Sequence, residues 1–150
     1  MPMQTRLVRI RSSMDADFPA YLALFTAYEE EIGLNPAGSR EKLLRRVDRE
    51  GAQDLHALLL AEETPAGFVH AHPEAQAGWI YSFYVAPAFR RRGLGRSLAA
   101  HGEAWLWTAG ARAVLLTPEK AAAGFWKKAG YTPTGRMDPT DGAEIWQKGN

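Results

Sequence analysis

The sequence predicts one α/β (α+β) domain in which helices cover a central sheet. A chain of 150 residues with 46% hydrophobic residues can bury one ordinary core. The spacing of its apolar residues changes from helical to strand-like near residue 55. Ala113–Leu116 is an almost continuous apolar run, typical of a strand at a sheet centre covered on both faces. The expected order is strand, two helices, three strands, helix, strand, helix and two strands.

Two helices are predicted near the N-terminus. Apolar side chains repeat at helical spacing over 18–32, and Asp15 or Asp17 can cap the start of this helix. Ser39 can cap a second helix, and Gly51 would end it.

Strands are expected on both sides of these helices. The first is Leu7–Ile10, and the next three are Leu55–Ala61, Phe68–His72 and Trp79–Val85. The residues Thr64–Gly67 carry proline and glycine and predict the hairpin turn between the second and third strands.

The C-terminal half continues the alternation of helices and strands. An amphipathic helix is expected from Leu94 to about Thr108, followed by the strand Ala113–Leu116. A short helix over Pro118–Ala129 then leads to two final strands, Tyr131–Arg136 and Ala143–Gln147.

A basic loop with two glycines joins the strand that ends at Val85 to the helix that begins at Leu94. Glycine lets the backbone approach an anion, and a helix N-terminus carries roughly half a positive charge. The arginines of the loop supply further positive charge, so the loop predicts a pyrophosphate-binding site. Its spacing, Arg90-x-x-Gly93-x-Gly95, matches neither the Walker pattern nor the dinucleotide fingerprint.

This loop resembles the acyl-CoA loop of the GNAT superfamily of N-acetyltransferases, Arg/Gln-x-x-Gly-x-Gly/Ala. A second block, Glu119-x-x-Ala122-x-x-Phe125-Trp126-x-x-x-Gly130-Tyr131, is similar to the family's Asn-x-x-Ala-x-x-Phe-Tyr-x-x-x-Gly-Phe. The resemblance implies a single GNAT-like domain over residues 1–150. It implies a GNAT fold, with a mixed, mostly antiparallel sheet of about six to seven strands flanked by about four helices. The implied reaction moves an acetyl group from acetyl-CoA directly to a primary amine of a small molecule or peptide.

The resemblance also indicates which residues would hold acetyl-CoA. Glu119 replaces an asparagine that contacts the pantetheine arm, and Trp126 replaces a tyrosine that protonates the departing thiolate in many members. Phe125 shares a helix face with Ala122 and Ala129 and is expected in the core, and Trp126 projects about 100° away from it. The resemblance implies that Trp126 faces the acyl-CoA channel. A tryptophan N–H has no useful acidity and cannot serve as the acid. The expected acetyl-CoA-binding residues are Phe83, Val85, Arg90, Arg91, Arg92, Gly93, Leu94, Gly95, Arg96, Ser97, Glu119 and Trp126.

The strand before the loop offers no general base, because it has no carboxylate and no histidine. His70 and His72 share a face of the neighbouring strand, and an imidazole suits a base near neutral pH. The alternative is that both are ordinary polar strand residues. Tyr81 and Tyr84 are candidates for the acid or for substrate contacts, or else are packed aromatics. The predicted catalytic residues are therefore Tyr81, Tyr84, His70 and His72, with no metal.

Composition limits the other functions. The chain has no cysteine, so acyl transfer must be direct or use a non-thiol nucleophile. A net charge of +1 disfavours nucleic acid, despite Arg90–Arg92, and no run approaches the ~18 apolar residues of a membrane span. A cytoplasmic protein is expected, and a homodimer is common for the resemblance. The alternative function is an acyl-CoA-binding module without acetyltransferase turnover, which Trp126 favours.

Overall fold

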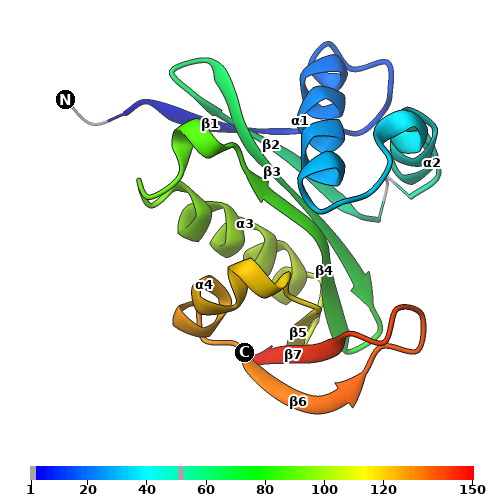
Figure 1. Ribbon diagram of the computed structural model, residues 1–150, viewed down its shortest axis with the longest axis vertical. Coiled ribbons are helices and arrows are strands. Elements are labelled where there is room, and N and C mark those ends of the chain that lie inside the picture. Colours follow the sequence, from blue (N-terminus) through cyan, green and yellow to red (C-terminus); the bar gives the residue numbers. More distant parts are fainter. Residues whose placement is uncertain (1–2, 51–52) are drawn as a thin grey trace.

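A seven-stranded mixed sheet forms the centre of the computed structural model, which describes residues 3–50 and 53–150 (Figure 1). The spatial order is β1-β2-β3-β4-β5-β7-β6, and within it only the β4–β5 pair is parallel. The strands are β1 (Thr5–Arg9), β2 (Leu55–Ala61), β3 (Thr64–Glu74), β4 (Ala77–Val85), β5 (Ala113–Leu116), β6 (Thr132–Met137) and β7 (Glu144–Gly149).

Helices cover both faces of this sheet. In Figure 1, α1 and α2 lie on one face, and α3 and α4 lie on the other. The helices are α1 (Phe18–Glu31), α2 (Ser39–Glu50), α3 (Leu94–Thr108) and α4 (Ala123–Lys128). No helix in the described ranges is both long and apolar enough to cross a membrane.

The sheet separates two hydrophobic clusters, and β2 contributes to both. Leu58 and Leu60 pack with Phe68 and the buried side of α1 and α2, whereas Ala57 and Leu59 pack with the cluster under α3. Successive strand side chains point to opposite faces, so a strand between two helical layers is apolar throughout. This explains why every residue of β2 is buried.

The hairpin turn predicted at Thr64–Gly67 was misplaced. Glu62 and Glu63 form the turn, with positive φ angles of 50° and 63°, and Ala61 pairs with Thr64. A two-residue turn with both φ angles positive matches the twist of the flanking strands, although glycine or asparagine usually fills it. The proline at position 65 lies beside a register shift in the ladder, where its missing N–H is tolerated.

The N-terminal caps predicted for α1 and α2 were also wrong. Asp17 precedes α1 but makes no side-chain cap, and the carboxylate of Asp15 accepts hydrogen bonds from backbone N–H groups of the preceding loop. Ser39 is the first residue of α2, and its hydroxyl donates to Glu29 Oε1 at 2.7 Å instead of capping. The predicted end of this helix at Gly51 lies outside the described residues.

The helix predicted over Pro118–Ala129 is shorter than expected. A 3-10 turn at Lys120–Ala122 precedes α4, which ends at Lys128. Glu119 is extended, with φ −62° and ψ 142°, so the chain leaves β5 as a loop before it coils. By contrast β2, α3 and β5 have the predicted bounds, and β6 and β7 differ by at most two residues at either end.

Candidate functional site

The middle of the sheet opens between its two parallel strands. β4 pairs with β5 only from Ala77 to Trp79, after which β4 continues to Val85 while β5 ends. Tyr81 is an extra residue in the β3–β4 ladder, because His70 pairs with Ser82 while the following residue pairs with Ile80. Such bulges re-aim side chains and are frequent beside active sites. Here the bulge leaves the Tyr81 side chain 46% exposed at the opening.

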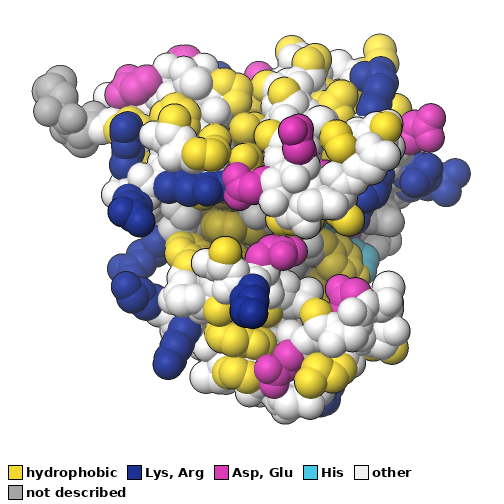
Figure 2. Space-filling model, in the orientation of Figure 1, with side chains coloured by type: hydrophobic (Ala, Val, Ile, Leu, Met, Phe, Trp, Pro, Cys, Tyr) yellow, Lys and Arg dark blue, Asp and Glu magenta, His cyan; other side chains and the backbone are white. Residues whose placement is uncertain are grey.

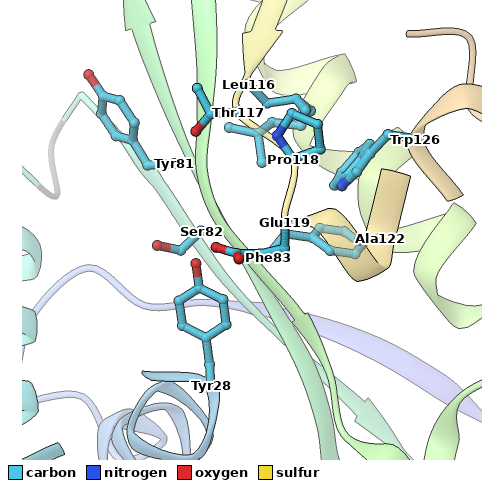
Figure 3. Close-up of a pocket in the computed structure, with 11 residues that line it drawn as sticks. Tyr28, Tyr81, Ser82, Phe83, Leu116, Thr117, Pro118, Glu119, Ala122 and Trp126 are labelled. Carbon is cyan, nitrogen blue, oxygen red and sulfur yellow. The ribbon is translucent and has the colours of Figure 1, made fainter. Parts of the chain in front are cut away.

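A small cavity lies where the strands separate, and we call it the strand cavity (Figure 3). Its volume is about 60 Å³. Its walls come from α1, β4, the segment after β5, and α4. The lining residues are Tyr28, Ile80, Tyr81, Ser82, Phe83, Leu116, Thr117, Pro118, Glu119, Ala122 and Trp126.

A larger cavity of about 380 Å³ lies beside the β6–β7 turn, and we call it the hairpin cavity. Ile80, Tyr81 and Thr117 line both cavities, so the two meet at the bulge in β4. Figure 2 shows the molecule hollowed between the half that carries α1 and α2 and the half that carries α4 and β7. The hairpin cavity is lined by Arg46, His70, Trp79, Ile80, Tyr81, Thr117, Asp138, Thr140 and Asp141.

A buried carboxylate orients the two predicted histidines. Asp54 Oδ2 is 2.7 Å from His70 Nε2, and Asp54 Oδ1 is 2.7 Å from His72 Nδ1. Burial alone would raise the pKa of Asp54, but the hydrogen bonds from both rings outweigh it and hold that pKa below its usual value. An ionised carboxylate only accepts hydrogen bonds, so both ring nitrogens must carry the protons.

The two ring nitrogens of His70 have different surroundings. Nδ1 is buried and has no hydrogen-bond partner among the described residues. Burial lowers the pKa of His70 below its usual value; Asp54 opposes this shift, and the nearby charge of Arg46 adds to it. A neutral His70 with its proton on Nε2 therefore has a free lone pair on Nδ1, and His70 is one of the residues that line the hairpin cavity.

The imidazole of His56 packs against the ring of His70. The His56 ring stacks on His70 with 4.0 Å between centroids, and its Nδ1 lies 2.8 Å from the Tyr21 hydroxyl. Burial, and then the nearby His70, lower the pKa of His56 to about 3. The ligand atoms of Asp54, His56 and His70 lie within 4.8 Å of one another. The two rings are stacked with 23° between their planes, however, so their lone pairs lie in nearly parallel planes, which does not suit convergent metal coordination.

The buried neutral His56 predicts acid-sensitive stability. Between its folded pKa of about 3 and an unfolded value near ~6.5, only the unfolded chain binds this proton. The contribution of His56 to the free energy of unfolding is therefore fully present above about pH 6.5. It falls as the pH drops, by up to about 1.4 kcal/mol per pH unit. Urea unfolding of wild type and His56→Gln should show the gap between them shrinking by roughly 2 kcal/mol from pH 7 to pH 5. A gap that does not change would contradict a neutral His56.

A second polar chain crosses from the helices to the strand cavity. The Arg46 Nη1 group donates to Ser82 Oγ at 3.2 Å, and the hydroxyls of Ser82 and Tyr28 also hydrogen-bond. Burial raises the pKa of Tyr28, and the negative charge of Glu119 raises it further. Figure 3 shows Tyr28 pointing from α1 toward Ser82, with Glu119 reaching the same place from the other wall.

Sequence reasoning missed Asp54, Tyr28 and Arg46. Asp54 comes directly before β2, and an aspartate followed two residues later by a histidine carries no motif. Tyr28 and Arg46 lie on helices that pack on the sheet through non-local contacts. No local spacing could have placed them beside β4.

The basic loop ends at the N-terminus of α3, as predicted. Gly93 precedes the helix with a φ of 80°, and no side chain caps it. The first N–H groups of a helix have no partner within the helix, so these remain available to an anion. Arg91 also has a positive φ of 64°, which is uncommon outside glycine. Figure 2 shows Lys and Arg side chains gathered at the left of the view, the side on which this loop lies in Figure 1.

The second glycine and the first arginine of the loop also have structural roles. A Cβ at Gly95 would lie 3.1 Å from the Phe125 ring, so this glycine lets α3 pack against α4. Arg90 is held by Glu31 at 2.7 and 2.9 Å, and its Nε donates to the Val85 carbonyl at 2.8 Å. The Arg90 guanidinium therefore ties the loop to the end of α1.

The remaining predicted residues divide between the cavities and the core. Phe83 lines the strand cavity, whereas Tyr84 is buried against α1, where its hydroxyl donates to Glu31 Oε1 at 3.4 Å, and lines neither cavity. His72 lies outside both linings, and its ring stacks on Tyr81. The cofactor-loop residues Arg92, Arg96 and Ser97 are exposed, and Leu94 is buried under α3.

The predicted orientation of α4 was partly wrong. Trp126 is only 4% exposed and packs edge-to-face on Phe83, Phe125 and Tyr131, whereas Phe125 is only partly buried. The short α4 turns its largest side chain into the core, because burying the larger aromatic removes more apolar area from water. One side of Trp126 still lines the strand cavity, as Figure 3 shows.

Comparison with known families assigns this architecture. The model of the acetyltransferase (GNAT) family matches residues 16–131, which is most of the chain. The chain belongs to this family. The match includes α1, the basic loop, α3 and α4, and stops at Tyr131. It agrees with the resemblance that the loop and the second block indicated, and it makes the protein an acetyltransferase.

Solved structures share the fold of this GNAT acetyltransferase at low sequence identity. The PaiA N-acetyltransferase of Thermoplasma acidophilum, in complex with coenzyme A, is 17% identical over 100% of both chains, with a TM-score of 0.77. An acetyltransferase from Streptococcus agalactiae is 15% identical, covers 97% of this chain and 98% of its own, and has a TM-score of 0.75. A GCN5-related N-acetyltransferase from Ralstonia eutropha is 20% identical over 91% and 97%, with a TM-score of 0.69. A search of curated proteins gave no significant sequence match.

Proposed function

We propose that this protein is an acetyl-CoA-dependent N-acetyltransferase that moves an acetyl group directly to a primary amine of a small molecule or peptide. The observation that carries the proposal is the meeting of the two cavities at Tyr81, beside His70. The strand cavity would take the acyl end of the donor, and the hairpin cavity would take the amine. We further propose that residues 1–150 form one catalytic domain, which the continuous sheet supports.

In this proposal, acetyl-CoA binds at the start of α3 and along the free edge of β4. Free N–H groups at the start of α3 and the exposed side chains of Arg91, Arg92 and Arg96 suit a pyrophosphate. Beyond Trp79, the β4 edge toward β5 pairs with no strand among the described residues. Apart from the Val85 carbonyl, which accepts from Arg90, its backbone groups are therefore available to an extended amide-bearing arm. Acetyl-CoA supplies a thioester, and the backbone near Val85 would polarise its carbonyl.

The base in this proposal is His70. An ammonium with a pKa near ~10.4 is not a nucleophile, so the amine must first lose a proton. The first proton of the ammonium goes to solvent. As the N–C bond forms and the C–S bond breaks, the second proton of the amine passes to His70 Nδ1, directly or through water. The thiolate takes a proton from Tyr81 or leaves without one, and His70 then releases its proton to solvent or to the tyrosinate. Asp54 keeps the proton of neutral His70 on Nε2 and stabilises the imidazolium that forms.

The acid in this proposal is Tyr81, which lines both cavities, rather than Tyr84 or Trp126. A thiol with a pKa near ~8.5 can also depart without a proton, so the demand on this acid is small. Packing in the core accounts for Trp126, so this residue no longer favours a binding module without turnover. A cytoplasmic location, where acetyl-CoA is supplied, belongs to the same proposal, and a homodimer stays a prediction.

Thermal unfolding with and without acetyl-CoA tests the proposal first. At about a hundred times the dissociation constant, binding should stabilise the fold by roughly 2.7 kcal/mol, a rise of about 5–10 °C in Tm. Release of free thiol with a panel of primary amines then tests turnover. A Tm shift without thiol release from any amine would indicate a binding module, and no shift at any concentration would overturn the donor assignment.

A further inference from the structure

Arg46 is a cation with no carboxylate partner among the described residues, and it lines the hairpin cavity. Its contacts are one hydrogen bond to Ser82 and a position over the Phe25 ring, 5.6 Å from the centroid. A guanidinium has five N–H donors in a planar fork that matches a carboxylate. Most of these donors remain available at the cavity wall.

The rest of the hairpin cavity explains where such an anion would lie. Its wall beside Arg46 is formed by His70, and the aromatic rings of Trp79 and Tyr81 stack with 6.0 Å between centroids. The cavity therefore presents, in one space, a base, a cation and an apolar surface. Because His70 and Arg46 line the same cavity, one small acceptor with its amine near His70 would also reach Arg46.

The two carboxylates that line this cavity, Asp138 and Asp141, accept hydrogen bonds from the backbone of the β6–β7 turn. Asp138 Oδ1 accepts the Thr140 N–H at 2.8 Å, and Asp141 Oδ1 accepts the Ala143 N–H at 2.9 Å. These bonds shape the β6–β7 turn. Both aspartates belong to the turn and neither pairs with Arg46, so the positive charge at the α2 wall is left for the ligand.

We propose that the acceptor is an amine that also carries a carboxylate, of the α-amino acid type with an apolar side chain. Arg46 binds the carboxylate, the amine faces His70, and the side chain lies on Trp79 and Tyr81. This inference rests on the proposed function, because it names the substrate class of the same site. It makes Arg46 a specificity-determining residue, distinct from the base.

Matched pairs of acceptors test the inference. Each amino acid is compared with the amine that lacks only its carboxylate: L-phenylalanine with phenethylamine, L-leucine with 3-methylbutylamine, and L-methionine with 3-(methylthio)propylamine. The wild-type enzyme should have a kcat/KM at least about thirtyfold higher for the amino acid of its best pair. Arg46→Gln should lower this kcat/KM about a hundredfold, mainly through KM, and the loss for the paired amine should be at least about tenfold smaller. Arg45→Gln removes an exposed arginine one position away and is the matched control, expected to change neither.

Two outcomes of this comparison overturn the inference. An equal loss for both members of the pair would place Arg46 in catalysis or in folding rather than in recognition of the carboxylate. A wild-type preference for the amine over the amino acid would assign the cavity to cationic acceptors through Asp138 and Asp141.

A binding measurement separates this inference from the proposed function. Calorimetric titration of the CoA-saturated protein with the N-acetylated forms of the three amino acids needs no turnover. Binding to wild type that Arg46→Gln weakens at least tenfold supports the carboxylate site even if no amine is acetylated. Absence of binding by all three, in a protein that acetyl-CoA stabilises, overturns the carboxylate site and leaves the donor assignment standing.

Discussion

Replacement of His70 by glutamine should lower kcat/KM for the amine by about 10²–10⁴-fold. Glutamine keeps an N–H donor for Asp54 but offers no basic nitrogen at the wall of the hairpin cavity. Steady-state thiol release measures the loss, and the affinity for acetyl-CoA should stay within threefold because His70 lies outside the strand cavity. A variant that keeps more than a third of the rate would contradict the assignment of His70 as the base.

His72→Gln is the matched control for this experiment. His72 donates to the same Asp54 carboxylate but lines neither cavity, so its loss should cost less than about fivefold in kcat/KM. Asp54→Asn tests the orienting role, because an amide can donate to His70 Nε2 and favour the wrong tautomer. Circular dichroism and Tm identify any variant that fails to fold.

The pH profile adds a signature of His70. Burial lowers the pKa of His70, so His70 is already neutral above its ordinary value near ~6.5. The wild-type log kcat/KM should therefore fall because of His70 only as the pH drops below about 6.5. The ionisation of the amine should affect log kcat/KM at alkaline pH. His70→Gln should lose the change in log kcat/KM at acid pH and keep the one at alkaline pH.

Charge reversal at the loop should weaken acetyl-CoA binding about a hundredfold or more. Arg92 and Arg96 are exposed beside the N-terminus of α3, and Arg92→Glu with Arg96→Glu replaces two positive charges by two negative ones. Calorimetric titration measures the dissociation constant, and the effect should shrink at high salt because the site is exposed. An affinity within threefold of wild type would remove the loop from the donor site.

The paired change Arg112→Glu with Arg136→Glu is the control for the loop variant. Both residues are exposed and lie outside the loop and both cavities, and their reversal alters the net charge by the same amount. Substitution of Gly93 is a poorer test, because its φ of 80° strains any side chain even though a Cβ would meet nothing within 4 Å.

Local sequence patterns were enough to predict most of the elements and the family. Local signals were sufficient for β2, α3 and β5, whose bounds were predicted, and for the loop at the start of α3, whose glycine and arginine spacing resembles the GNAT pattern. These features depend on neighbours within a few residues, so they are readable without the fold. The hairpin turn was misplaced because Glu62 and Glu63 adopt positive φ without the residues that usually signal it.

The candidate site depends on contacts between residues that are far apart in the sequence. The tertiary structure joined Asp54 to His70 across sixteen residues, placed Arg46 beside Ser82, and directed Trp126 rather than Phe125 into the core. The bulge at Tyr81 and the early end of the β4–β5 ladder created the two cavities and their junction. The physical reason is that strand pairing and helix packing bring together residues distant in sequence, and the burial and hydrogen bonds that tune an ionisable side chain come from those partners.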